Sequence, residues 1–286
     1  MNKQLFSQIS SFLDTKSFIK NKHGDPDDEE NNKLYEFLGA PFPYYKISEG
    51  KLLIISDLHI PYMWREGVDA IIDRHASPDT TLIINGDLVD METFSSFTKN
   101  KSTTFEEELS ETVDWLKDVA PRFKEVLLIK GNHEERLRRS LMRLPEFVQV
   151  SAFFHPEVFE ILKAILAEYN IRNIKNFNSF FLQINDDMVL AHPQNFRRVP
   201  GATAKGTIEY VLQFVKTVKY VVVGHTHRQA KISHLGVHGI EQGCLCGRLP
   251  YEMTSGRITL IAQDRGYVIA EIKDGETIDI GLMTLR

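Results

Sequence analysis

Cysteine is scarce in this chain of 286 residues, because only Cys244 and Cys246 occur, separated by Leu245. A disulfide between cysteines this close together in an extended chain would be strained, so we expect both thiols to be reduced. We interpret them as small buried side chains, with a redox pair as the alternative.

Long apolar runs are missing as well. No segment has the length of a membrane span, and residues 1–10 lack the apolar core of a signal peptide. We therefore expect a cytoplasmic protein with no membrane partner.

An excess of basic charge is the third absence. The chain has 34 Lys and Arg against 39 Asp and Glu, a formal net charge of -5. This balance argues against broad, nonspecific binding of nucleic acid but leaves room for a local basic strip. Apolar residues make up 42% and charged residues 26%, ordinary values for a globular protein, and the length fits one large catalytic domain with additions.

The first part of the chain differs in character from the rest. Apolar residues at helical spacing predict an amphipathic helix over 3–19, and the charged segment 25–32 fits an exposed linker. We assign residues 1–47 to an N-terminal helical extension that could contact a partner or a second subunit, and residues 48–286 to the catalytic domain.

Strands and helices alternate in the middle of the chain, which is typical of parallel βαβ units. The later segments predict mostly antiparallel strands and a second sheet. We expect an α/β fold with two facing mixed β-sheets flanked by helices. The predicted strands are 52–56, 81–85, 126–130, 179–184, 188–191, 221–224, 230–235, 237–242, 257–263 and 267–272. The predicted helices are 65–75, 105–120, 133–144, 145–170 with a break near Pro156, and 203–215 with Thr203 as its cap.

Polar side chains follow five of the predicted strands directly. Because open α/β sheets bind ligands beyond the carboxyl ends of their strands, we expect these side chains to form one site. They are Asp57 and His59, Asp87 and Asp90, Asn132 and His133, His192, and finally His225 and His227.

Carboxylate, amide and imidazole groups suit divalent ions such as manganese, iron or zinc, and manganese is our first choice. Asp57 and His59 are two residues apart in a segment predicted to be extended, so both side chains should reach one ion; His225 and His227 have the same spacing. There are more candidate ligands than one ion needs, so we expect two ions that share a carboxylate. The candidates are Asp57, His59, Asp87, Asn132, His192, His225 and His227.

The order of these motifs resembles that of the calcineurin-like metallophosphoesterase superfamily. The motifs are Asp-x-His, Gly-Asp-x-x-Asp, Gly-Asn-His-Glu, a single His and Gly-His-x-His, and they span about Lys51 to Arg228. Gly-Asn-His-Glu alone would occur by chance in roughly one chain of this length in a thousand. The resemblance implies a four-layer sandwich of two sheets between helices.

The resemblance also implies a role for each matching residue. Asp57, His59 and His227 would hold one ion, Asn132, His192 and His225 the other, and Asp87 would bridge the two. His133 would be the general acid that protonates the leaving group, with Asp90 orienting its ring. A water between the ions would attack phosphorus in line.

Two departures from known branches bear on the substrate. Protein phosphatases of this type carry Arg after the second Asp of their motif, whereas Met91 follows Asp90 here; repair nucleases tend to carry His and Asp where this chain has Asp90 and Glu134. We therefore slightly prefer phosphodiesters of the nucleotide or nucleic-acid type. The alternatives are a phosphomonoesterase, including an atypical serine/threonine protein phosphatase, and a catalytically silent metal-binding scaffold.

Several arginines are candidates for substrate contact. Arg197 and Arg198 closely follow His192, so they could line the rim of the site and contact a phosphate, or be ordinary loop charges. Arg136, Arg139 and Arg143 share one side of a predicted helix, which fits a solvated face better than a polyanion site.

Overall fold

The computed structural model describes residues 42–95, 103–143, 157–249 and 263–285. Residues 1–41 of the predicted extension lie outside the described residues, as do residues 257–262 of one predicted strand. The boundary between residues 47 and 48 stays a prediction, although Phe42, Tyr45 and Ile47 are buried. No helix within the described ranges is long and apolar enough to cross a membrane.

The first sheet is mixed and six-stranded, in the order β12-β11-β2-β3-β4-β5. Three of its four parallel strands, β2, β3 and β4, consist largely of buried apolar residues, as expected for strands that are covered on both faces. The parallel strands are β2 (Gly50–Ile55), β3 (Thr80–Asn85), β4 (Glu125–Ile129) and β5 (Ile174–Phe177), and the antiparallel strands are β11 (Gly266–Lys273) and β12 (Glu276–Thr284).

The second sheet also has six strands, in the order β1-β6-β7-β8-β10-β9. Its central strands β7, β8 and β10 are parallel, so the carboxyl ends of β7 and β8 lie at one edge. The strands are β1 (Tyr44–Tyr45), β6 (Phe181–Ile184), β7 (Met188–Ala191), β8 (Tyr220–Val223), β9 (Gln229–His234) and β10 (Val237–Gln242).

Side chains from the two sheets meet in a shared core, which shows that the sheets face each other. Leu52 and Ile54 of β2 pack in one cluster with Leu190 of β7 and Val222 of β8. The alternate residue Leu53 belongs to a second cluster, between the first sheet and its helices. Residues that alternate along one strand therefore fill two different cores.

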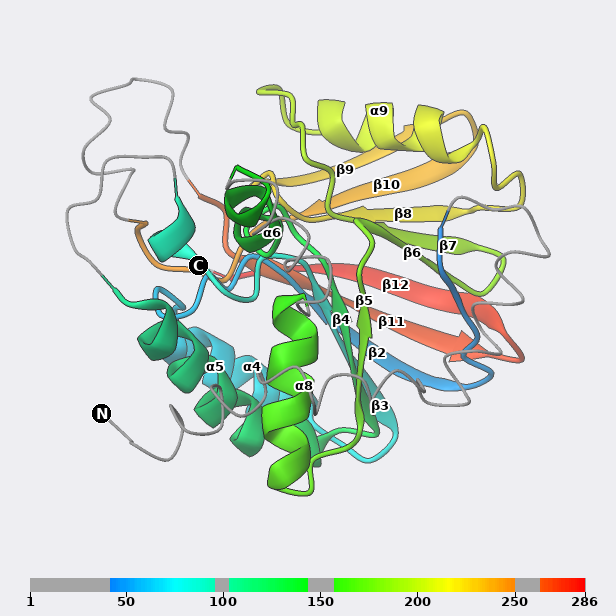
Figure 1. The fold of residues 1–286 in the computed structure, drawn as a ribbon. Helices are drawn as coiled ribbons and strands as arrows, with labels where there is room; N and C mark the ends of the chain where they lie inside the picture. Colours follow the sequence, from blue (N-terminus) through cyan, green and yellow to red (C-terminus); the bar gives the residue numbers. More distant parts are fainter. Residues whose placement is uncertain (1–41, 96–102, 144–156, 250–262, 286) are drawn as a thin grey trace.

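Helices complete the outer layers (Figure 1). Three cover the first sheet, one covers the second, and α6 lies near the ends of the strands. The predicted architecture of two facing mixed sheets flanked by helices is confirmed. The helices are α4 (Arg65–His75), α5 (Phe105–Val119) and α8 (Val158–Glu168) on the first sheet, α9 (Ala202–Val211) on the second, α6 (Glu135–Leu141), and the short 3-10 turns η1 (Glu92–Phe94) and η2 (Ala120–Arg122).

Some details of the sequence prediction are wrong. Among the later strands, β9 and β11 are antiparallel to their neighbours as predicted, but β8 is parallel to both of its neighbours, and β11 joins the first sheet beside β2 instead of the second. Thr203 does not cap α9 with its side chain. Instead, the carboxylate of Glu241 accepts hydrogen bonds from the backbone N–H groups of Gly201, Thr203 and Ala204, which satisfies the free donors of the helix terminus.

Candidate metal centre and active site

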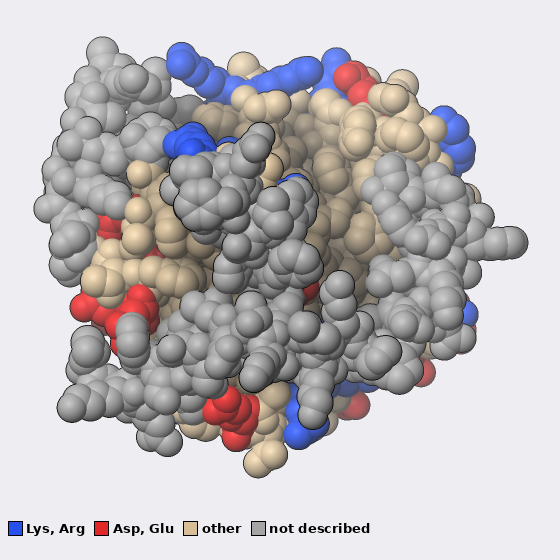
Figure 2. Space-filling view, viewed as in Figure 1, with Lys and Arg blue, Asp and Glu red and all other residues tan. Residues whose placement is uncertain are grey.

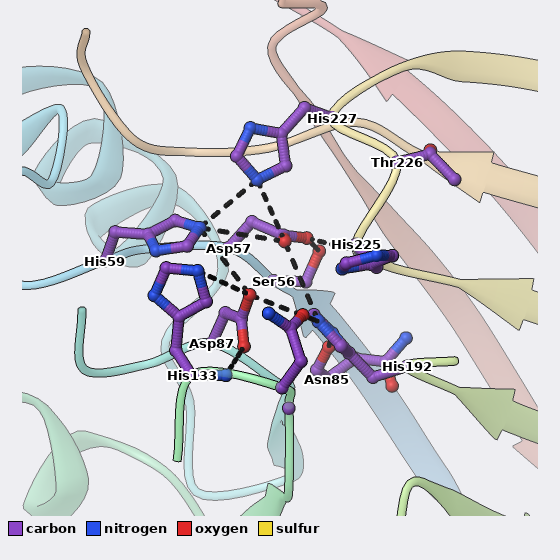
Figure 3. A network of polar contacts seen from close by, with 12 residues as sticks. Ser56, Asp57, His59, Asn85, Asp87, His133, His192, His225, Thr226 and His227 are labelled. Atoms are coloured by element: carbon purple, nitrogen blue, oxygen red, sulfur yellow. Dashed lines mark hydrogen bonds and ion pairs between the residues drawn. The ribbon is translucent and has the colours of Figure 1, made fainter. Parts of the chain in front are cut away.

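The ends of five strands converge at one edge of the two sheets (Figure 3). The segments after β2, β3 and β4 come from the first sheet, and those after β7 and β8 come from the second. Together they bring all seven predicted metal ligands, His133 and Asp90 into one network of contacts. The structure thus gathers residues that lie up to 170 positions apart, from Asp57 to His227.

One group of potential ligands consists of Asp57, His59 and His227. Nε2 of His227 lies 3.1 Å from Oδ1 of Asp57 and 3.2 Å from Nε2 of His59. The distance from Nε2 of His59 to Oδ1 of Asp57 is 3.9 Å. These three atoms face one another closely enough to share one ion.

The second group consists of Asn132, His192 and His225. Oδ1 of Asn132 lies 3.3 Å from Nε2 of His192, and the rings of His192 and His225 are 5.3 Å apart between centroids. His225 and His227 fall in different groups, as the family resemblance implies, although their spacing alone had suggested that both reach one ion.

Asp87 lies between the two groups. Its Oδ2 is 3.7 Å from Nε2 of His59 in the first group and 3.3 Å from Nε2 of His192 in the second. This is the position that a carboxylate shared by two ions would need.

The backbone at these residues is not extended, contrary to the prediction. Asp57, His59, Asp87, His225 and His227 all have positive φ, between 50° and 72°. Such a conformation costs about 1 kcal/mol or more for a residue other than glycine. Since the surrounding fold imposes it at five of the seven candidate ligands, strain is concentrated at this site.

Hydrogen bonds at the far side of the rings orient two of the histidines. Nδ1 of His192 lies 2.7 Å from the carbonyl oxygen of Asn85, and Nδ1 of His59 lies 3.0 Å from Oδ1 of Asp90. Because each Nδ1–H then donates to an oxygen, Nε2 is the nitrogen of each ring that faces the centre.

Among the described residues, Nε2 of His225 has no hydrogen-bond partner, and Oδ1 of Asp57 has none beyond its 3.1 Å contact with Nε2 of His227. The other oxygen of Asp57 accepts hydrogen bonds from Ser56 Oγ and from the backbone N–H of His225. Buried polar atoms are rarely left unsatisfied. A divalent cation would satisfy both, so the donor set fits a metal centre.

The electrostatics of the site fit cations equally well. Burial alone would raise the pKa of Asp57, but the charges of His227 and His192 outweigh it and lower that pKa to about 2. Burial and the neighbouring His192 lower the pKa of His225 to about 3, so its imidazole is neutral. Ionised carboxylates and neutral imidazoles are the forms that bind metal ions. Burial would lower the pKa of His192, but the charges of Asp87 and Asp57 outweigh it and raise that pKa to about 9, so His192 would release a proton on binding an ion.

His133 and Asp90 form a pair beside this centre. Nδ1 of His133 lies 2.7 Å from the carbonyl oxygen of Asp90 and 3.1 Å from its Oδ1. Burial would raise the pKa of the Asp90 carboxyl, but hydrogen bonds from His133 and His59 outweigh it and lower that pKa well below the usual range. Asp90 therefore contacts His133 as its predicted role requires, and it also holds a ring of the first ligand group.

Glu134 is a residue of the site whose role the sequence analysis missed. Its buried carboxylate accepts backbone N–H groups from Asp87 at 3.1 Å, Val89 at 3.1 Å and Gly131 at 2.8 Å. It thereby ties the segment after β3 to the segment after β4. Glu134 is the last residue of the Gly-Asn-His-Glu motif, and this position was the signal for its role in the sequence. The sequence analysis did not use it, because it considered only candidate metal ligands and the proposed acid.

Gly131 allows these two segments to approach closely. A Cβ at this position would lie 2.1 Å from Oδ1 of Asp87 and 2.4 Å from the Asp87 backbone nitrogen. No residue with a side chain fits here without moving the central carboxylate.

Arg136 does not lie on a solvated helix face with the other arginines of α6. Its Nη1 donates to the Asp90 carbonyl oxygen at 2.8 Å, its Nη2 lies 2.8 Å from Nε2 of His133, and its side chain is 14% exposed. Arg138 and Arg139 are exposed, and Arg139 binds Gln194. Arg136 is therefore part of the site.

The segment after His192 lies beside the site, but Arg197 and Arg198 in this segment make their contacts outside the site. The ring of Phe196 contacts that of His225, with 5.4 Å between centroids. Arg197 packs over Gly206 of α9, and the carbonyl oxygen of Arg198 accepts from Arg228. Both are exposed, so their predicted contact with substrate stays a prediction.

Both cysteines are buried and are not joined to each other by a disulfide, and Cys246 lies at the edge of the site. Its Sγ is 3.9 Å from Nδ1 of His227, and with His59 and His227 it forms a third group of potential ligands. The sequence analysis named no cysteine among the candidate ligands and so missed this neighbour.

Comparison with known proteins identifies the family. The family model of the calcineurin-like phosphoesterases matches residues 50–229, which includes every residue of the two ligand groups. The chain belongs to the calcineurin-like phosphoesterase family. Membership supports a metal-dependent hydrolase that acts on phosphoesters, and the buried cluster of histidines and carboxylates is able to bind such metals.

Solved structures resemble the chain only distantly. An archaeal phosphodiesterase is 15% identical, with a TM-score of 0.40, over 82% of this chain and 99% of that one. Vps29 from Entamoeba histolytica in complex with zinc is 14% identical, with a TM-score of 0.41, over 82% and 98%. A protein serine/threonine phosphatase from Saccharomyces cerevisiae is 13% identical, with a TM-score of 0.41, over 100% and 97%. No curated protein sequence matches the chain. Similarities this low carry no information about the substrate.

Proposed function

We propose that this protein hydrolyses phosphoesters with the help of two divalent ions, with manganese as the first choice. Asp57, His59 and His227 would hold one ion, Asn132, His192 and His225 the other. The observation that carries the proposal is the position of Asp87, whose Oδ2 lies within 3.7 Å of His59 Nε2 and 3.3 Å of His192 Nε2. A single carboxylate between two sets of nitrogen and oxygen ligands is the arrangement of a two-metal site.

Two ions held there would supply a nucleophilic water at neutral pH and offset the negative charge that develops on the phosphoryl oxygens. The chain itself must position the leaving group and provide its proton. Asp57 and Asp87 are fixed for their part by hydrogen bonds from backbone N–H groups of His225 and His133, at 3.0 and 2.9 Å.

His133 is the residue proposed to donate that proton. With its Nδ1–H held by Asp90, the ring presents Nε2 to the site. The imidazolium gives the Nε2 proton to the leaving oxygen and becomes the neutral Nδ1–H form, which the two oxygens of Asp90 stabilise. Asp90 thus acts as a positioning residue for His133.

The class of ester is open to a direct test. We propose a slight preference for phosphodiesters, because no arginine follows Asp90 and Met91 at that position is buried. The purified protein should be assayed with manganese on bis-p-nitrophenyl phosphate and on p-nitrophenyl phosphate. Faster turnover of the diester would support the proposal, and a clear preference for the monoester would favour a phosphomonoesterase. Absence of turnover with either ester and with nucleotides would favour a metal-binding scaffold.

A further inference from the structure

Arg136 occupies the position beside His133 that the leaving oxygen must reach in the proposed proton transfer. Its Nη2 lies 2.8 Å from Nε2 of His133, the atom that must face the leaving oxygen. An arginine has no lone pair to offer, so the contact requires Nε2 of His133 to be the acceptor. In this arrangement His133 is neutral and its Nε2 is covered.

The guanidinium is anchored at one end only. Nη1 donates to the Asp90 carbonyl oxygen at 2.8 Å and lies 3.9 Å from Asp90 Oδ2. Nη2 has only the nitrogen of His133 as its acceptor among the described contacts. A neutral nitrogen is a weaker partner for a guanidinium than an anionic oxygen, because only the anion adds the attraction between two opposite charges.

A phosphoester that offers an anionic oxygen to Arg136 can therefore displace His133 from this contact. Among the described residues, Arg136 is the one Lys or Arg whose side chain contacts His133 or Asp90. Its side chain is 14% exposed, so it is held in place and still open to a ligand. Figure 2 shows Lys and Arg side chains along the upper edge of one face of the molecule, and Arg138 and Arg139 of α6 are exposed.

We propose that Arg136 binds an oxygen of the substrate's phosphoryl group and, in turning to it, uncovers Nε2 of His133 for the leaving oxygen. Nη1 stays on the Asp90 carbonyl, and Nη2 exchanges the imidazole for the phosphoryl oxygen. Once uncovered, Nε2 takes up a proton from solvent and faces the leaving oxygen as the imidazolium that donates it. This role rests on the proposed function for its consequence in catalysis, but the binding of a phosphoryl anion can be measured without turnover.

Arg138 provides a matched control on the same helix. It lies two residues further along α6, its side chain is 57% exposed, and its Nη1 pairs with Glu135 at 3.5 Å. Replacing it removes one arginine from the same element without touching His133 or Asp90.

The test measures binding of inorganic phosphate to the manganese-loaded, full-length protein by calorimetry. Arg136→Ala is expected to weaken phosphate binding about tenfold or more, and Arg136→Lys to retain part of the affinity, because a lysine keeps the charge but not the anchored fork. Arg138→Ala should bind phosphate within about twofold of the wild type. Metal content should be the same in all four proteins.

Wild-type affinity for phosphate in Arg136→Ala overturns the proposal, even if turnover falls, because the arginine would then only support His133. If Arg136→Ala does not fold, Arg136→Gln takes its place, since it keeps a donor near Asp90 and lacks the charge; wild-type affinity in that variant overturns the proposal equally. A wild-type protein that binds phosphate through Arg136 but hydrolyses no ester would reject the proposed function and leave this inference standing.

Discussion

Oδ2 of Asp87 lies 3.3 Å from Nε2 of His192, although Asp87 follows a strand of the first sheet and His192 follows a strand of the second. The contact joins the two halves of the site. The candidate coordinating atoms come together only when the two sheets pack face to face, so the proposed metal centre is a product of the whole fold.

The first prediction concerns this shared carboxylate. Asp87→Asn removes a charge that both ligand groups face, so the purified variant should retain less than half of the metal bound by the wild type and lose most of its activity. Metal content by elemental analysis checks this. Asp69→Asn, at an exposed position of α4, is the control and should match the wild type.

Replacing the proposed acid should separate metal binding from catalysis. His133→Asn is expected to lower kcat about a hundredfold for an alkyl ester, whose leaving group needs a proton, and much less for a p-nitrophenyl ester. The metal content should not change. Equal effects on the two kinds of ester would argue against proton donation by His133.

Close approach of two segments at Gly131 gives a steric prediction. In Gly131→Ala the new Cβ would lie 2.1 Å from Oδ1 of Asp87, so the carboxylate must move. We expect lower metal content and a free energy of unfolding reduced by about 2 kcal/mol. Gly206→Ala is the matched control, because its Cβ meets Arg197 at an ordinary 3.5 Å in the middle of α9, and it should stabilise the protein by up to about 1 kcal/mol.

Glu108 makes stability depend on pH. Its side chain is fully buried on α5, and burial together with the charge of Asp90 raises its pKa to about 8. The folded protein therefore holds this proton over a range in which the unfolded chain has lost it, between about pH 4.5 and pH 8. Glu108 contributes its full stability below that range, and the contribution falls as pH rises through the folded pKa.

Glu108→Gln should remove this dependence. Relative to the wild type, the variant should gain stability by up to about 1.4 kcal/mol per pH unit across the range, measured by urea unfolding at pH 5, 7 and 9. Glu111→Gln, exposed on the same helix, serves as the control. Parallel curves for Glu108→Gln and the wild type would show that Glu108 is ionised in the folded protein throughout.

Much of the fold was readable from the sequence because its strands are short apolar runs with clear ends. The segment 188–191 matches β7, and the helix predicted over 65–75 matches α4. In contrast, β12 was missed because it is charged and only partly buried, and its pairing with β11 defines it. The four-residue β5, with Lys175 and Asn176 at its centre, likewise depends on β4, nearly fifty residues earlier.

Within the site, the motifs identified which residues meet but not how they are held. The left-handed backbone of Asp57 and His59 runs against local preference and is imposed by tertiary packing. Helical spacing placed Arg136 on one face with Arg139 and Arg143, but only the structure places the segment carrying Asp90 against the first of them. Contacts between segments far apart in the sequence determine both the backbone conformation of Asp57 and His59 and the position of Arg136.

The presence of two ions is the central claim, and a crystal structure of the protein grown with manganese tests it most directly through anomalous scattering. The account predicts two peaks, one next to Asp57, His59 and His227 and one next to Asn132, His192 and His225, with Asp87 touching both. No peak at these residues, or a single ion that leaves Asp87 on one side, would contradict it.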